Sequence, residues 1–154
     1  ENLKSASSAK TTRKTSDVQQ YSGFNIGEDM FGVSVFDVQE IIKPQKVTTV
    51  PLADSHINGL INLRGQIVTL INLRKLFGIK GDPDRDYMNV IVRSGDSLTA
   101  LMVDDISDVI DVGQDTFEKT PDTFDPKLRP FVKGVHKLKE NLLVVLNLNK
   151  ILTN

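Results

Sequence analysis

Few residues of this chain have the types and spacing that catalysis requires. The sequence contains two histidines, His56 and His136, and no cysteine, which excludes thiolate nucleophiles and cysteine-based metal sites. No serine stands in a nucleophile-elbow pattern, and no Gly-rich loop that could cradle phosphate precedes a predicted helix. The residues therefore favour a binding protein over an enzyme, and they predict no metal site and no cofactor.

An alternating acidic string is the nearest approach to a metal-binding motif. Asp82, Asp84 and Asp86 have the spacing of the first calcium ligands of an EF-hand loop. Such a loop needs glycine at its sixth position and glutamate at its twelfth, where this chain has Tyr87 and Arg93. A polar linker explains the string better than a calcium site.

Four other acidic residues leave one enzymatic alternative open. Glu40, Asp104, Asp105 and Asp108 could converge in the fold as paired carboxylates, the groups that glycoside hydrolysis uses. Nothing in their spacing singles them out. A carboxylate-based hydrolase on a small β-barrel is therefore kept as a remote alternative.

Arg64 is the most distinctive candidate for binding. It stands between an apolar run and Gly65, where its guanidinium group could offer a planar pair of donors to a carboxylate or an amide. Most arginines are simply exposed, so the residues alone favour a solvated turn arginine over a binding residue.

The elements that would position Arg64 are the two apolar runs of residues 59–78. They are split by Arg64 and Gly65, and Gly65 supplies the positive φ of a tight hairpin turn. Both strands carry large aliphatic residues at both parities, which predicts a hairpin that is covered on both faces. Asn72 then begins a short helix that ends at Gly78.

The same plan returns near the C-terminus, which predicts two similar β-subdomains that share a core. Asn147 follows the apolar run 142–146 and lies 75 residues after Asn72, while residues 106–110 match residues 38–42 at a spacing of 68. The first spacing also relates three further pairs: Ile57 and Val132, Gly59 and Gly134, and Lys75 and Lys150. We expect four residues near the shared core: Leu60, Leu70, Val144 and Leu146.

Length and composition fit one domain of 154 residues with a real core, or two small fused domains. A net charge of −1 gives no general attraction to nucleic acid, and no apolar run predicts direct insertion into a membrane. Residues 1–17 are polar and mildly basic, which predicts a disordered N-terminal tail. The domain should then occupy residues 18–154, with the boundary between subdomains near residues 80–87.

Three motifs resemble the CheW-type chemotaxis coupling proteins. They are GLINLRGQIVTLINLR (Gly59–Arg74), FGVSVFDVQEI (Phe31–Ile41) and VDDISDV (Val103–Val109). The resemblance runs from about Val18 to the C-terminus. It implies a mainly β fold, in which two SH3-like five-stranded β-barrels with short helices pack around one hydrophobic core.

The resemblance also implies the function and its partners. The family is a non-enzymatic adaptor that joins the cytoplasmic tips of methyl-accepting chemotaxis receptors to the regulatory domain of a CheA-type histidine kinase. The protein would be cytoplasmic and recruited to membrane-associated receptor arrays. The resemblance implies the receptor-binding residues Val38, Glu40, Gly59 and Arg64, and the kinase-binding residues Val47, Val50 and Phe124.

The chain departs from the usual family pattern at several positions. Thr69 stands where proline is usual, and Asn72 where aspartate is common. Asp105 replaces a frequent glycine, and Glu118 replaces a basic residue near the second kinase contact. Two related functions stay open: a coupling domain of a larger protein, of the CheV type or from a CheA C-terminus, and an adaptor in a pathway other than chemotaxis.

Overall fold

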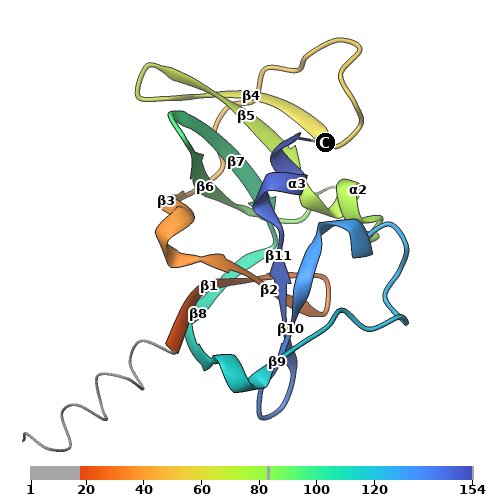
Figure 1. Cartoon of the computed structure of the whole chain (residues 1–154). Helices are drawn as coiled ribbons and strands as arrows, with labels where there is room; N and C mark the ends of the chain where they lie inside the picture. Colours follow the sequence, from red (N-terminus) through yellow and green to blue (C-terminus); the bar gives the residue numbers. More distant parts are fainter. Residues whose placement is uncertain (1–17, 83, 154) are drawn as a thin grey trace, which may run out of the picture.

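The computed structural model describes residues 18–82 and 84–153 (Figure 1). The predicted tail of residues 1–17 lies outside the described residues. Strands dominate the described chain, and its helices are short, so the mainly β fold class is confirmed. The strands are β1 (Val18–Ile26), β2 (Asp29–Ser34), β3 (Val38–Ile42), β4 (Ile57–Leu63), β5 (Gln66–Asn72), β6 (Met88–Ser94), β7 (Ser97–Val103), β8 (Asp105–Gly113), β9 (Phe117–Glu118), β10 (Val132–Lys137) and β11 (Leu142–Leu146). The helices are η1 (Val35–Asp37), α2 (Leu73–Phe77), η2 (Gln114–Thr116), η3 (Arg129–Phe131) and α3 (Leu148–Thr153).

The strands form two sheets that exchange hairpins between the halves of the chain. One sheet has the order β8-β1-β2-β11-β10-β9, and the other has the order β3-β6-β7-β5-β4. The β1–β2 hairpin therefore lies among strands of the second half, and the β6–β7 hairpin lies among strands of the first half. The parallel pairs β2–β11 and β5–β7 join each hairpin to its sheet.

The expected boundary near residues 80–87 does not separate the two sheets. This link connects α2 to β6, and both β5 and β6 belong to the five-stranded sheet. The chain passes between the sheets at η1, between β2 and β3, and again at Asp104, between β7 and β8. The halves are contiguous in sequence, but each half completes its sheet with a hairpin of the other.

Both sheets are closed in the same way, by a backbone segment that passes close to a glycine. In the five-stranded sheet, Thr48 and Leu60 exchange two hydrogen bonds of 2.8 Å. A Cβ atom on Gly59 would lie 2.5 Å from the carbonyl oxygen of Thr48. In the other sheet β9 pairs with β10, and a Cβ atom on Gly134 would lie 2.6 Å from the carbonyl oxygen of Glu118. The register shifts of β4 and β10 end at these two glycines.

The first turns of α2 and α3 are also built alike, and α2 is the helix that was predicted after Asn72. The side chain of Asn72 accepts a hydrogen bond from the backbone N–H of Lys75 at 3.3 Å, and Asn147 does the same for Lys150 at 3.3 Å. Gly78 ends α2 in the left-handed conformation, with φ of 74°.

Three apolar clusters form the interior. The largest draws on both sheets and on α2, and it contains Phe31, Phe77, Leu101 and Val144. A second cluster lies within the five-stranded sheet and a third within the six-stranded sheet. Val144 and Leu146 lie in the shared core as expected, but Leu70 belongs to the second cluster and Leu60 is only half-buried. Register explains the difference: Ile71, one residue later, faces the shared core instead.

Candidate functional site

Arg64 and Glu40 form a bidentate ion pair on the surface of the five-stranded sheet. Arg64 and Gly65 both have positive φ, 50° and 88°, which is the geometry of a type I′ hairpin turn between β4 and β5. The amide oxygen of Asn62 accepts the Gly65 N–H at 2.8 Å and fixes the turn. Arg64 Nη2 contacts Glu40 Oε2, and Arg64 Nη1 lies 3.3 Å from Glu40 Oε1.

This pair is accessible to solvent, mainly through Arg64. The side chain of Arg64 is 69 % exposed and that of Glu40 is 26 % exposed. The hydrogen bond and the charge of Glu40 raise the pKa of Arg64, so the guanidinium group is always charged. An exposed ion pair contributes little to the stability of the fold. Arg64 and Glu40 could therefore separate and each bind a charged or polar group of a partner protein instead.

The other two expected receptor-binding residues lie differently. Val38 is half-buried and packs against the shared core, two residues before Glu40 on β3. Gly59 is buried where β4 meets the closing segment, the stretch around Val47 and Thr48 that pairs with Leu60, and it has φ of 147°. Gly59 therefore acts through its backbone and the closure of the sheet, and the structure does not bring it to the exposed surface beside Arg64.

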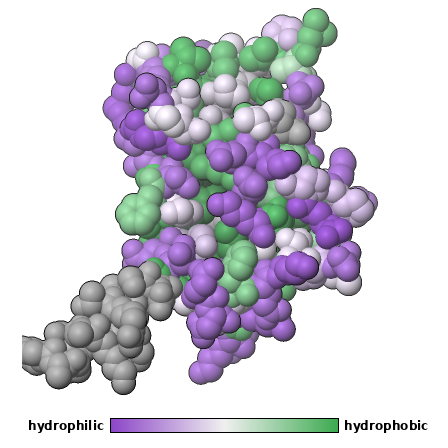
Figure 2. Space-filling view, viewed as in Figure 1, coloured by the Kyte–Doolittle hydropathy of each residue, from purple (hydrophilic) through white to green (hydrophobic). Residues whose placement is uncertain are grey.

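The segment of residues 43–56 carries two expected kinase-binding residues. Val47 is half-buried and packs against the interior of the five-stranded sheet, while Val50 is partly exposed. Leu52, beside them, is fully exposed and was not anticipated. In Figure 2 polar side chains cover much of the visible face, and apolar ones appear along the end of the molecule that β4, β5 and this segment form in Figure 1.

Phe124, the expected kinase contact of the second subdomain, borders a pocket of about 470 Å³. The side chain is half-buried and packs against the shared core. The pocket has an apolar floor that includes Phe77 and Leu128, and its lining also includes three acidic residues: Glu28, Asp29 and Asp125. It could hold an apolar side chain that is flanked by a positive charge.

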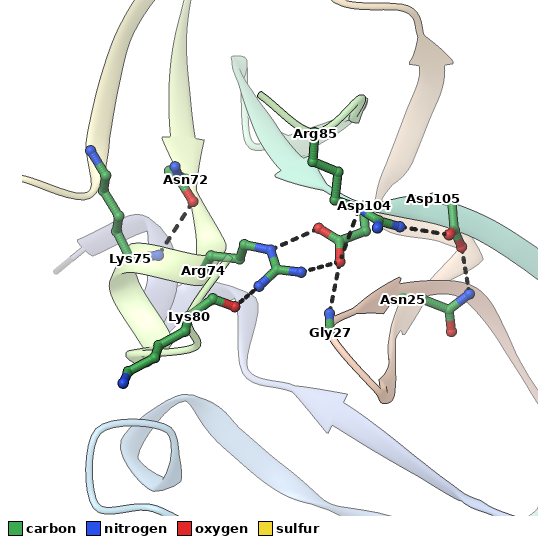
Figure 3. Close-up of polar contacts among 9 residues, drawn as sticks. All are labelled: Asn25, Gly27, Asn72, Arg74, Lys75, Lys80, Arg85, Asp104 and Asp105. Atoms are coloured by element: carbon green, nitrogen blue, oxygen red, sulfur yellow. Dashed lines mark hydrogen bonds and ion pairs between the residues drawn. The ribbon is translucent and has the colours of Figure 1, made fainter. Parts of the chain in front are cut away.

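Asp104 fastens the two sheets to each other, as Figure 3 shows. It lies between β7 and β8, and its Oδ1 accepts from Arg74 Nε at 2.9 Å. Its Oδ2 contacts Arg74 Nη2 at 2.5 Å and accepts the Gly27 N–H at 2.8 Å. Arg85 bridges Asp104 and Asp105, with a nitrogen atom 3.5 Å from each carboxylate. The carboxylate therefore joins α2 of one sheet to the β1–β2 turn of the other.

The polar cluster around Asp104 was not predicted. It bears on the hydrolase alternative, which needs two acidic residues whose carboxylates converge and remain free. Asp104 is engaged by Arg74 and Arg85, and Glu40 by Arg64, so these carboxylates are held by different arginines. Such pairing leaves neither acid as a free general base. Arg74 lies two residues after Asn72, the last residue of β5, but its partner is 30 residues away and no local pattern identifies it.

Comparison with known proteins assigns the family. The model of the CheW-like domain matches residues 20–154, which is most of the chain. The chain belongs to the CheW-like domain family. This confirms the resemblance drawn from the sequence, and the family is one of non-enzymatic scaffold and adaptor proteins.

Relatives of this CheW-like chain match most of its length. A chemotaxis protein CheW of Helicobacter pylori is 29 % identical over 153 residues, which cover 99 % of this chain and 92 % of the relative. A CheW of Thermotoga maritima is 28 % identical and covers 84 % of each chain. The crystal structure of the scaffolding protein TtCheW from Thermoanaerobacter tengcongensis matches with a TM-score of 0.75 and 30 % identity, over 84 % of this chain and 88 % of that one. These matches confirm the two SH3-like subdomains.

His136 of the CheW-like chain is a buried histidine inside the second subdomain. It lies between the rings of Tyr21 and Phe117, whose centroids are 5.6 and 5.1 Å from its own. Its Nδ1 lies 2.8 Å from Thr116 Oγ1, and the Thr116 hydroxyl donates to the Gly113 carbonyl, so Nδ1–H of His136 is the donor. His136 thereby holds η2 and β9, which close the sheet, and this core position explains it without any chemistry.

The stability of the CheW-like domain should fall in two steps as the pH is lowered. Burial lowers the pKa of His136 below 6.5, with Asp115 opposing, so neutral His136 is favoured on folding and stability is lost as pH falls below about 6.5. At Asp104, burial raises the pKa, but hydrogen bonds from Arg74 and Gly27 and the arginine charges outweigh it, so the pKa lies below 3.8. Stability is lost again below about that pH.

Thermal melts between pH 8 and pH 3 measure both steps. Residue 61, which lies 75 residues before His136 at the matching position of the first subdomain, is isoleucine. His136→Ile should therefore be tolerated, and it should abolish the loss of stability near pH 6.5. Asp104→Asn should abolish the lower step. A His136→Ile melt that still declines below pH 6.5 would assign the upper step to another group.

The described part of the CheW-like chain offers no cluster of three or more His, Cys, Asp or Glu residues that could hold a metal ion. None of its helices is long and apolar enough to span a membrane. Asp82, Asp84 and Asp86, the acidic string noted in the sequence, lie in the link between α2 and β6.

Proposed function

We propose that this CheW-like chain is a non-enzymatic adaptor that couples the cytoplasmic tips of chemotaxis receptors to the regulatory domain of a CheA-type histidine kinase. The family match over residues 20–154 is the observation that carries the proposal. Its named relatives include chemotaxis CheW proteins and a scaffolding protein. The adaptor is cytoplasmic and is recruited to receptor arrays at the membrane.

The receptor binds at the Arg64–Glu40 pair under this proposal. Arg64 is exposed and sits in a defined turn, Glu40 beside it is partly exposed, and half-buried Val38 lies on the same strand as Glu40. A helical receptor tip would take its register from hydrogen bonds to the two charged groups and its contact area from the apolar residues around them. Gly59 supports this surface from below, because it lets the closing segment approach β4.

The kinase regulatory domain binds at two other places. Val47 and Val50 offer apolar surface on the first subdomain, and Phe124 offers the edge of an apolar pocket on the second. Val47 lies against Gly59 of the hairpin, whereas Phe124 borders the pocket beside the β1–β2 turn in the other sheet, so the Phe124 contact is the one that leaves the Arg64 turn free for a receptor. Glu118, the departure from the family pattern, pairs with Lys137 at 3.4 Å and so has a partner within the chain.

Arg64→Ala should weaken binding of a receptor cytoplasmic fragment by roughly 10-fold or more, the effect of losing a charge-assisted contact at an interface. Folding should barely change because the side chain is exposed. Binding of the kinase regulatory domain should persist. Titration of both partners and a thermal melt of the variant make the measurement.

Arg129→Ala is a matched control for this experiment. Arg129 is also a partly exposed arginine in a surface ion pair, with Asp122 at 3.4 Å, but it lies in η3 of the other subdomain. It should leave receptor binding unchanged. If Arg64→Ala keeps full receptor affinity but loses stability, Arg64 is a structural residue and the receptor binds elsewhere.

A further inference from the structure

Asn89 has a buried side-chain amide without a polar partner. It lies on β6 and is completely buried, and neither its amide oxygen nor its amide nitrogen forms a hydrogen bond within residues 18–82 and 84–153. Burying an unpaired amide costs the fold the hydration of two polar groups. Any opening of the structure that lets water reach this amide recovers that cost.

The position of Asn89 in the five-stranded sheet indicates which strand has to move for water to enter. Alternation along β6 puts its side chain on the same face as Ile91, which belongs to the cluster inside this sheet. Its cross-strand neighbours are Ile42 on β3 and Met102 on β7, and both pack against that cluster. β7 is paired on both sides, whereas β3 is an end strand of the sheet. Water therefore reaches Asn89 most readily when β3 moves away from β6.

β3 is held more weakly than the other strands of its sheet. None of its five residues is buried, whereas each of the other four strands has at least three buried residues. Its pairing with β6 is interrupted by a register shift between Val38 and Glu40. Its side-chain hydrogen bonds lie on the surface: Gln39 Oε1 accepts from Arg93 Nη2 at 2.7 Å, and Glu40 pairs with Arg64. Exposed contacts of this kind contribute little to stability.

The chain that follows β3 adds little support. Val38 and Ile42 are the residues of β3 that pack against the apolar clusters, and both are only half-buried. Within the described part of the chain, no backbone–backbone hydrogen bond involves residues 43–47, and pairing resumes at Thr48 with its two bonds to Leu60. β3 and residues 43–47 can therefore move together, between η1 on one side and Thr48 on the other.

We propose that β3 detaches locally from β6 while the rest of the fold stays intact, and that the unpaired amide of Asn89 lowers the cost of this opening. The detaching strand carries Val38 and Glu40, two of the residues proposed above to bind the receptor. A receptor that binds Glu40 and Arg64 together also holds β3 in place. Receptor binding and the closing of β3 are then coupled, and this part of the inference rests on the proposed function.

Amide hydrogen exchange of the whole chain, followed residue by residue by NMR, tests the opening. The amides of β3 that bond to β6 should exchange at least about 10-fold faster than the amides of β7, the central strand. Asn89→Val removes the unpaired amide and keeps a residue that favours strands, so it should slow exchange in β3 by about 10- to 100-fold. β9, a two-residue strand of the other sheet, should keep its exchange rates.

Asn89→Asp is the matched variant with the opposite effect. Aspartate has nearly the same shape as asparagine, but its charge would have no partner in the interior, so β3 should exchange about 10-fold faster than in the natural chain at pH 7. The difference between the two chains should shrink at pH 5, because burial favours the protonated carboxyl group. If Asn89→Asp does not fold, the comparison of Asn89→Val with the natural chain still decides the result.

Two outcomes would overturn the proposal. Equal exchange rates in β3 and β7 of the natural chain would mean that β3 separates only when the whole domain unfolds. Fast exchange in β3 that Asn89→Val leaves unchanged would mean that the opening does not reach the amide. A third outcome would overturn only the coupling: if β3 opens as expected but a saturating receptor fragment does not slow its exchange, the receptor binds elsewhere and the proposed receptor surface is wrong.

Discussion

Gly59→Ala should lower the free energy of unfolding by about 2–5 kcal/mol, from overpacking and backbone strain together. The residue has φ of 147°, where side chains are strained. Its new Cβ atom would also lie 2.5 Å from both the Thr48 carbonyl oxygen and Val47 Cγ1. Because Thr48 closes the five-stranded sheet through its bonds to Leu60, the substitution would push the closing segment away.

Urea denaturation measures this loss, and Gly65→Ala is its matched control. Gly65 also has positive φ, 88°, but nothing lies within 4 Å of the Cβ atom that alanine would add. Gly65→Ala should therefore show the strain without the clash, and a smaller loss. A Gly59→Ala variant that folds as stably as the natural chain but no longer binds receptor would mean that the backbone at Gly59 contacts the receptor directly.

Leu70→Ala should also cost about 2–5 kcal/mol, the range for emptying a buried aliphatic site. Leu70 is completely buried in the cluster inside the five-stranded sheet, where its neighbours include Ile61, Val68 and Ile91. The cluster is small, so few side chains can move to fill the cavity. Denaturant melts at neutral pH give the free energy of unfolding.

Ile67→Ala serves as the control for this second loss. Ile67 is on the same strand, β5, but its side chain is 61 % exposed. Its truncation should change stability by less than about 1 kcal/mol. Equal losses at the two positions would show that burial does not decide the effect, and a loss below about 1 kcal/mol at Leu70 would place its side chain in solvent.

The local structure around the hairpin could be predicted because short-range chemistry determines it. Gly65 supplies the positive φ of the turn, and Asn72 and Gly78 supply the two ends of α2. The repeat of the whole plan was also visible, since Asn147 stands 75 residues after Asn72 with matching residues around both. Each of these signals lies within a few residues of the feature it determines.

The exchange of hairpins could not be predicted in the same way. A hairpin such as β6–β7 has the same turn and the same apolar pattern whichever sheet it joins, so its neighbours depend on long-range pairing. The assignment of Leu70 to the shared core failed for this reason. Its strand has buried residues on both faces at this end, Leu70 on one and Ile71 on the other, although Ile67 near the turn is exposed, so the residue pattern does not say which face meets the other subdomain.

The candidate site was predicted as residue types but not as contacts. Glu40 and Arg64 were named together as receptor-binding residues but not as partners of each other. Their ion pair spans 24 residues because closure of the sheet brings β3 to the hairpin turn. The full exposure of Leu52 was missed because an isolated leucine in a loop gives no signal of whether it is buried. The role of Gly59 was assigned to binding, whereas its close approach to Thr48 appears only in three dimensions.

The exchanged hairpins also determine when the chain can fold during its synthesis. The β1–β2 hairpin leaves the ribosome first, but its sheet neighbours β8 and β11 end only at Gly113 and Leu146. The β1 edge therefore stays unpaired until β8 has been made, and the β2 edge until almost the entire polypeptide has been made; unpaired edges invite aggregation. The β3–β5 segment waits in the same way for β6 and β7. A growing chain of this kind cannot complete its first half and then its second, so a nascent chain stalled at mid-length should need protection by a chaperone.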